Sequence, residues 1–82
     1  MAEVWIRPLG NAWKVRMRSS DDVGRLRSSL VERGWRCTNP TPSFDDSSMV
    51  LFRVVGADQR HAVDLEKALH GIDWLKLMED PA

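Results

Sequence analysis

Apolar and basic residues alternate along the stretch Trp13–Arg18, WKVRMR. Because successive side chains of a β-strand point to opposite faces, this period of two predicts a strand with one buried face and one basic face. Residues 3–7, EVWIR, predict a further short N-terminal strand. The Pro, Gly and Asn of residues 8–11 would form the turn that returns the chain.

A helix is predicted directly after this strand. Ser20 or Asp21 is a suitable N-cap, and the two aspartates of the first turn complement the helix dipole. The apolar residues then recur at helical spacing, at Val23, Leu26, Leu30 and Val31. Gly34 is expected to end the helix as a left-handed C-terminal residue.

Two strands and a long loop are predicted next. Residues 35–38 alternate in polarity, and residues 49–55, MVLFRVV, form the most apolar run, rich in β-branched residues. Between them, residues 39–48 contain two prolines and a polar run, which predicts an exposed loop. We therefore expect residues 49–55 to form the middle of a sheet.

The last third of the chain predicts a second helix and a closing strand. Asp58 is a suitable cap, and the apolar residues that fall on one face are Ala62, Leu65, Leu69 and Ile72. Gly71 is expected to end the helix. Residues 73–79, DWLKLME, alternate and are interpreted as a strand. Continuation of the helix is the competing interpretation, because Leu, Lys, Met and Glu all favour helices.

The predicted order is strand, helix, strand, strand, helix, strand, with the N-terminal strand as an optional addition. This order is typical of an α+β, ferredoxin-like βαββαβ domain whose two helices cover one face of an antiparallel sheet. We expect one small domain over residues 1–82, with its core in residues 12–79. The other sheet face would be basic, and the residues expected there are Lys14, Arg16, Arg18, Arg36, Met49, Leu51, Arg53, Trp74, Lys76 and Met78.

The pattern Asp21-x-x-Gly24-x-Leu26, at the junction of a strand and a helix, resembles the corresponding turn of ACT domains, which are ferredoxin-like regulatory modules. The string VDLEKALHGIDWLKL, residues 63–77, is also similar to the second half of such a domain. The resemblance implies a small effector, commonly an amino acid, bound near a subunit interface. Carried over to this chain, it implies a ligand site that includes Arg18, Asp21 and Gly24.

Charge and candidate chemistry narrow the class of function. Twelve basic and twelve acidic residues give a formal net charge of zero, so any attraction to a polyanion must be local. His61 and His70 are too far apart on one helix to share a metal ion, and the lone Cys37 lacks a predicted activating base. We therefore expect no metal, no cofactor and no enzymatic activity. The single cysteine and the lack of an apolar span or signal peptide predict a cytoplasmic protein with no membrane association.

The leading hypothesis is a non-enzymatic regulatory or protein-interaction module that forms a homodimer or docks on a protein partner, and that senses a small effector. The alternative hypothesis is binding of single-stranded nucleic acid by the basic sheet face, because an aromatic residue among arginines and lysines can stack on bases. Both hypotheses use the same candidate surface, which comprises Arg16, Arg36, Met49, Arg53, Trp74 and Lys76.

Overall fold

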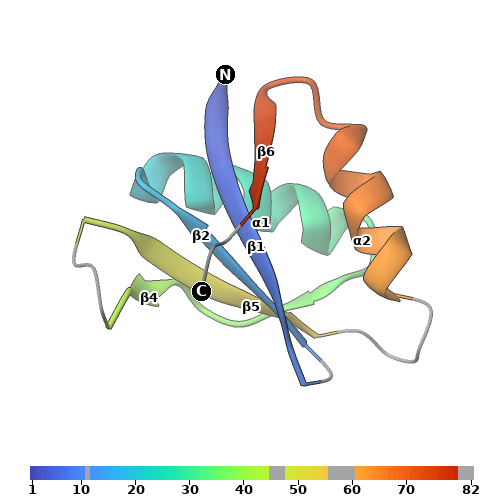
Figure 1. Cartoon of the computed structure of the whole chain (residues 1–82), viewed down its shortest axis with the longest axis horizontal. Coiled ribbons are helices and arrows are strands. Elements are labelled where there is room, and N and C mark those ends of the chain that lie inside the picture. Colours follow the sequence, from blue (N-terminus) through green and yellow to red (C-terminus); the bar gives the residue numbers. More distant parts are fainter. Residues whose placement is uncertain (11, 45–47, 56–60, 80–82) are drawn as a thin grey trace.

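The structure is a computed structural model that describes residues 1–10, 12–44, 48–55 and 61–79. Its described elements form a single sheet with two helices (Figure 1). In chain order the elements are β1 (Ala2–Leu9), β2 (Ala12–Met17), α1 (Ser20–Glu32), β3 (Arg36–Cys37), β4 (Thr41–Pro42), β5 (Val50–Val55), α2 (His61–His70) and β6 (Leu75–Glu79).

The sheet is mixed and has the strand order β3-β5-β2-β1-β6, with β4 also paired to β5. The β1–β2 and β2–β5 pairs are antiparallel, whereas β1 and β6 are parallel. The protein is therefore an α+β protein, but its sheet is not the predicted antiparallel one. A ferredoxin-like order would place β6 beside β2, and β1 occupies that position here.

The position of β1 follows from the turn that joins it to β2. Gly10 has a φ of 61°, and Leu9 pairs directly with Ala12, so the two strands form a tight hairpin. Because β1 and β5 occupy the two edges of β2, β6 cannot lie beside β2, and it pairs with the free edge of β1 instead. The predicted N-terminal strand thus exists, is longer than residues 3–7, and lies inside the sheet.

The opposite edge of the sheet is formed by β3 and β4, which run in sequence along β5. Thr38 continues this pairing, since its N–H donates to the Arg53 carbonyl oxygen at 2.9 Å and its Oγ1 accepts from the Arg53 N–H at 2.8 Å. Thr41 then pairs with Leu51, so residues 39 and 40 together oppose the single residue 52. This is the arrangement of a β-bulge. Part of the predicted exposed loop is therefore an edge strand.

Helix α1 begins and ends as capped helices do, although its N-cap is Ser19 rather than Ser20 or Asp21. The Ser19 Oγ accepts from the Asp22 N–H at 3.3 Å. At the other end, Gly34 has a φ of 91° and donates to the Val31 carbonyl, while the Trp35 N–H donates to the Leu30 carbonyl. This is the Schellman pattern, and it turns the chain from α1 directly into β3.

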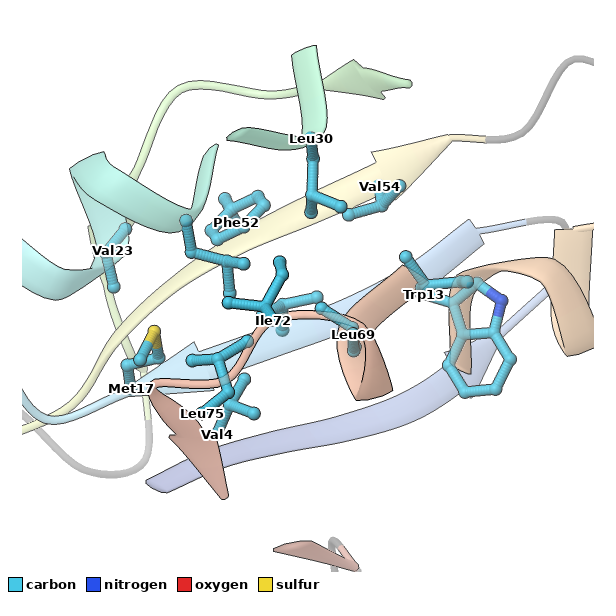
Figure 2. Packing of buried hydrophobic residues seen from close by; sticks show 13 residues of the cluster. Val4, Trp13, Met17, Val23, Leu30, Phe52, Val54, Leu69, Ile72 and Leu75 are labelled. Carbon is cyan, nitrogen blue, oxygen red and sulfur yellow. The ribbon is translucent and has the colours of Figure 1, made fainter. Parts of the chain in front are cut away.

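One hydrophobic core lies between the helices and one face of the sheet. Val15 and Phe52 from the strands, and Leu26 and Leu65 from the two helices, are all 0% exposed and belong to this cluster. Figure 2 shows Leu30 of α1 close to Val54 and Phe52 of β5. Both helices therefore cover the same sheet face, as predicted. Val31, expected in the core, is exposed.

The interpretation of residues 73–79 as a strand is confirmed, with the strand beginning at Leu75. Leu75 is buried and Leu77 is half-buried against the core, so this strand alternates as the sequence predicted. The predicted helix cap at Asp58 lies outside the described residues. In the part of the chain that the structure describes, no helix is long and apolar enough to cross a membrane.

Candidate functional site

The candidate site is the sheet face that the helices leave uncovered, which we call the open face. In Figure 1 the helix α1 lies behind the sheet. Strand alternation and the pairing register place on the open face seven of the twelve basic residues of the chain: Arg7, Lys14, Arg16, Arg18, Arg36, Arg53 and Lys76. Among the described residues of this face, Glu3 is acidic. A chain with zero net charge thus presents one strongly basic face.

Three of these basic residues form a line across the centre of the sheet, which we call the cation row. Arg7 of β1 lies directly opposite Lys14 of β2, and Lys14 lies directly opposite Arg53 of β5. Because neighbouring strands are about 4.8 Å apart, the row spans roughly 10 Å. Like charges directly opposite one another destabilise a sheet. This placement costs stability, and an anion bound over the row would offset that cost.

A second line runs beside the cation row, two residues further along the strands, and we call it the tryptophan row. Trp5 of β1 lies opposite Arg16 of β2 on one side and Met78 of β6 on the other, and Arg16 lies opposite Leu51. Trp5 is half-buried, so its ring contributes surface to the centre of the open face. The tryptophan row is therefore largely apolar, with one guanidinium among its four side chains.

Arg18 extends the basic surface beyond the end of β2. Its guanidinium carbon lies 5.2 Å from the centroid of the Trp5 ring, within the range of a cation–π contact. The Arg18 side chain is otherwise exposed. The face of the Trp5 ring therefore already accepts one flat, charged group.

Arg53 is held in place from the sheet edge through its main chain. The two hydrogen bonds with Thr38 fix its N–H and carbonyl groups. The same edge segment is tied to α1, because Arg27 donates to the carbonyl oxygens of Thr38 at 2.9 Å and Cys37 at 3.2 Å. The cation row thus lies on rigid, paired backbone rather than on a loop.

Two residues predicted for this surface lie elsewhere. Met49 precedes β5 and is 4% exposed, and its carbonyl oxygen accepts from the N–H of Ser43, the residue that follows the edge strand β4. Trp74 precedes β6, so strand alternation does not apply to it. Its ring packs beside the core and lies under the guanidinium of Arg25 from α1, at 4.1 Å. Neither side chain therefore adds apolar area to the open face, as had been expected of both.

The structure separates the residues of the predicted effector site. The Arg18 side chain turns to Trp5 on the open face, whereas Asp21 and Gly24 belong to α1, which covers the opposite face. Gly24 is exposed, and a Cβ added there would meet no atom within 4 Å. The glycine is thus not required by a close contact within the chain. The amino-acid effector stays a prediction.

The sequence interpretation missed two central residues of the open face, Trp5 and Arg7. The signal was present in residues 3–7, where Glu3, Trp5 and Arg7 alternate with the apolar Val4 and Ile6. The alternation does not by itself place Trp5 and Arg7 at the centre of the face, because that depends on the position of β1 between β2 and β6. The same alternation in the other strands correctly placed Arg16, Arg36, Arg53 and Lys76.

Cys37 lies on the helix side of the sheet, half-buried against the core. Burial raises the pKa of its thiol, and the positive charge of Arg27 opposes that shift. A raised pKa favours the unreactive thiol over the thiolate. Within the described ranges, no group of three or more His, Cys, Asp or Glu side chains could hold a metal ion.

Comparison with models of known protein families, with curated proteins and with solved structures finds no match to this chain.

Proposed function

We propose that the protein is a non-enzymatic binding module that holds single-stranded nucleic acid on the open face of its sheet. The observation that carries the proposal is the cation row of Arg7, Lys14 and Arg53. Three basic side chains placed directly side by side disfavour the folded state unless an anion lies over them. A sugar–phosphate backbone supplies regularly spaced anions for such a row.

The tryptophan row favours nucleic acid over a polyanion that lacks bases. Trp5 lies half-buried next to the cation row and offers a ring on which a base can stack. A single strand supports this use better than a duplex, because its bases are not already stacked and paired. The protein-partner hypothesis uses the same surface, with an acidic partner in place of the nucleic acid, and is the competing outcome of the test.

We also propose that this fold is related to the ferredoxin-like arrangement. If β1 is set aside, the remaining order is β3-β5-β2-β6, with the two helices on one face. That order supports a βαββαβ unit into which the N-terminal strand has been inserted. The inserted strand carries Arg7 and Trp5, so in this view it also brings two central residues of the binding surface.

The test is binding of a short, fluorescein-labelled oligothymidylate, followed by fluorescence anisotropy at several salt concentrations. We expect affinity to fall steeply between roughly 50 and 200 mM salt, with a logarithmic slope of about −0.7 for each phosphate contact. The double variant Lys14→Glu, Arg53→Glu should abolish binding. Its matched control is Lys67→Glu, Arg33→Glu, which makes the same change in net charge at two exposed positions away from the open face, one in α2 and one at the C-terminal cap of α1.

The control variant should bind as the unmodified protein does, apart from a small uniform loss due to net charge. Equal loss of binding in both double variants would show that total charge and not the open face governs the interaction. Absence of binding by the unmodified protein at low salt would overturn the proposal. Equal affinity for polyglutamate and oligothymidylate would support an acidic protein partner instead.

A further inference from the structure

We infer that the nucleic acid crosses the strands of the sheet with its phosphates over the cation row and one base stacked on Trp5. This inference rests on the proposed function and adds the path and the contacts of the ligand to it. It starts from the separation of two kinds of chemistry on the open face. All three side chains of the cation row are basic, and three of the four side chains of the tryptophan row are apolar.

The two rows are parallel and close enough to contact one nucleotide. Residues two apart in a strand lie about 6.8 Å apart, which is the separation of Arg7 from Trp5 and of Lys14 from Arg16. A nucleotide likewise has an anionic phosphate at one end and a flat, apolar base at the other, joined by a sugar. Phosphates over one row therefore direct bases toward the other.

The direction of the ligand follows from the direction of the rows. The cation row runs from β1 through β2 to β5, at right angles to the strands. Along β1 and β5, basic and apolar side chains occupy different rows: β1 carries Arg7 beside Trp5, and β5 carries Arg53 beside Leu51. Along β2 both positions are basic, with Lys14 beside Arg16. A ligand lying along β1 or β5 would place successive phosphates over unlike surfaces. A ligand lying across the strands meets a basic side chain at each step of the cation row, on β1, β2 and β5.

The contact between Arg18 and Trp5 indicates where the base stacks. In the free protein, the Arg18 guanidinium lies over the ring of Trp5, 5.2 Å from its centroid. A guanidinium and a nucleic-acid base are both flat groups that stack on aromatic rings. The base takes the place of the guanidinium over Trp5, and the exposed Arg18 side chain then turns toward a phosphate.

Two ligands of equal length distinguish the roles of the two rows: oligothymidylate, and an abasic oligonucleotide that keeps only sugar and phosphate. We expect Trp5→Leu to weaken oligothymidylate binding by about 5- to 150-fold, the equivalent of about 1–3 kcal/mol per stacked base. The same variant should bind the abasic strand as the unmodified protein does. Lys14→Gln should weaken both ligands and reduce the salt slope by about 0.7.

Trp5→Phe and Trp74→Leu are the controls. Trp5→Phe keeps a ring for stacking and should retain most of the affinity. Equal loss of affinity in Trp5→Phe and Trp5→Leu would indicate that substitution at this position damages the fold. Trp74→Leu removes a half-buried tryptophan from the helix side and should leave binding unchanged. Unchanged oligothymidylate affinity in folded Trp5→Leu would overturn the stacking inference while leaving the proposed function intact. Absence of oligothymidylate binding by the unmodified protein would overturn both.

Discussion

Lys14 and Arg53 lie directly opposite each other on β2 and β5, on the open face of the sheet. Arg7 lies opposite Lys14 on its other side, so Lys14 is the middle member of three adjacent cations. Paired positions in a sheet usually favour opposite charges or apolar contacts. A residue that lowers the stability of the folded state is a candidate for a functional role, because function and stability often conflict at binding sites.

The first prediction is that Lys14→Gln stabilises the protein while it weakens oligonucleotide binding. Removal of the central charge relieves two like-charge pairs, each unfavourable on the order of 0.2–1 kcal/mol. Urea denaturation at low salt should therefore show a higher midpoint with an unchanged m-value. The gain should shrink at high salt, because salt screens exposed charges. Lys67→Gln, at an exposed position of α2, is the matched control, and a lower midpoint for Lys14→Gln would contradict the repulsion.

The second prediction compares one substitution at two glycines. Gly24 lies in α1 with open space around its Cα, so Gly24→Ala should stabilise the protein by roughly 0.5–1 kcal/mol. Gly34 has a φ of 91° at the end of the same helix, so Gly34→Ala should destabilise it by about 1–2 kcal/mol. Thermal unfolding measures both. Two changes of the same sign would mean that the path of α1 or of its C-terminal turn is wrong.

A substitution at Gly24 also tests the predicted effector site. An amino acid that approached the backbone at Gly24 would be hindered by an added side chain, as the ACT resemblance implies. Isothermal titration with a panel of amino acids should show weaker binding to Gly24→Val than to the unmodified protein, if that site exists. Equal heats of binding for the two proteins would remove the site.

The third prediction concerns the core under α1. Leu30 is 0% exposed and belongs to the cluster that joins α1 to β5. Leu30→Ala should cost roughly 2–5 kcal/mol, the usual range for a large-to-small change at a buried leucine. Val31→Ala is the control, because Val31 lies next along the helix and is exposed. A loss of stability below about 1 kcal/mol for Leu30→Ala would mean that α1 packs on the core through a different face of the helix.

The fourth prediction concerns the reactivity of Cys37. Because burial raises the pKa of its thiol, the native protein holds less thiolate at pH 8 than the unfolded chain does. Iodoacetamide should modify the native protein more slowly than the urea-unfolded protein, and the native rate should continue to rise with pH above the normal range for a cysteine. Arg27→Gln should slow the native reaction further, since the Arg27 charge favours the thiolate. A faster native reaction would contradict the assigned burial.

The sign of the same pKa shift predicts how stability depends on pH. A raised pKa in the folded state means that the folded protein keeps the proton at pH values where the unfolded chain releases it. The contribution of Cys37 to stability is therefore present below the unfolded pKa and falls as pH rises above it. Cys37→Ser should remove this alkaline decline, as measured by urea denaturation across that range.

Much of the open face could be predicted from alternation alone. The period of two correctly assigned Lys14, Arg16 and Arg53 to one side, because alternation is a local property of each strand. Trp74 failed this rule because the strand begins one residue later, at Leu75, and the preceding turn directs its ring to Arg25. The burial of Met49 depends on its pairing with the segment after β4, and the alternation within residues 49–55 does not predict that pairing.

The position of each strand in the sheet was harder to predict than its faces. Alternation in residues 3–7 indicates which side chains share a face, but the neighbours of a strand are set by turns and by competition for edges. The tight turn at Gly10 joins β1 to β2 and so moves β6 outward. Because β1 therefore lies inside the sheet, Trp5 and Arg7 are central residues of the open face, although neither was predicted from the sequence to belong to the candidate surface.

The most direct test of the central claim is a solution NMR titration of the unmodified, isotope-labelled protein with oligothymidylate at low salt. We expect the indole N–H of Trp5 and the amides of β1, β2 and β5 around Arg7, Lys14 and Arg53 to shift, and the amides in the buried interior of α1 to stay in place. Shifts confined to the start of α1, around Asp21 and Gly24, or no shifts at saturating oligonucleotide, would contradict the central claim.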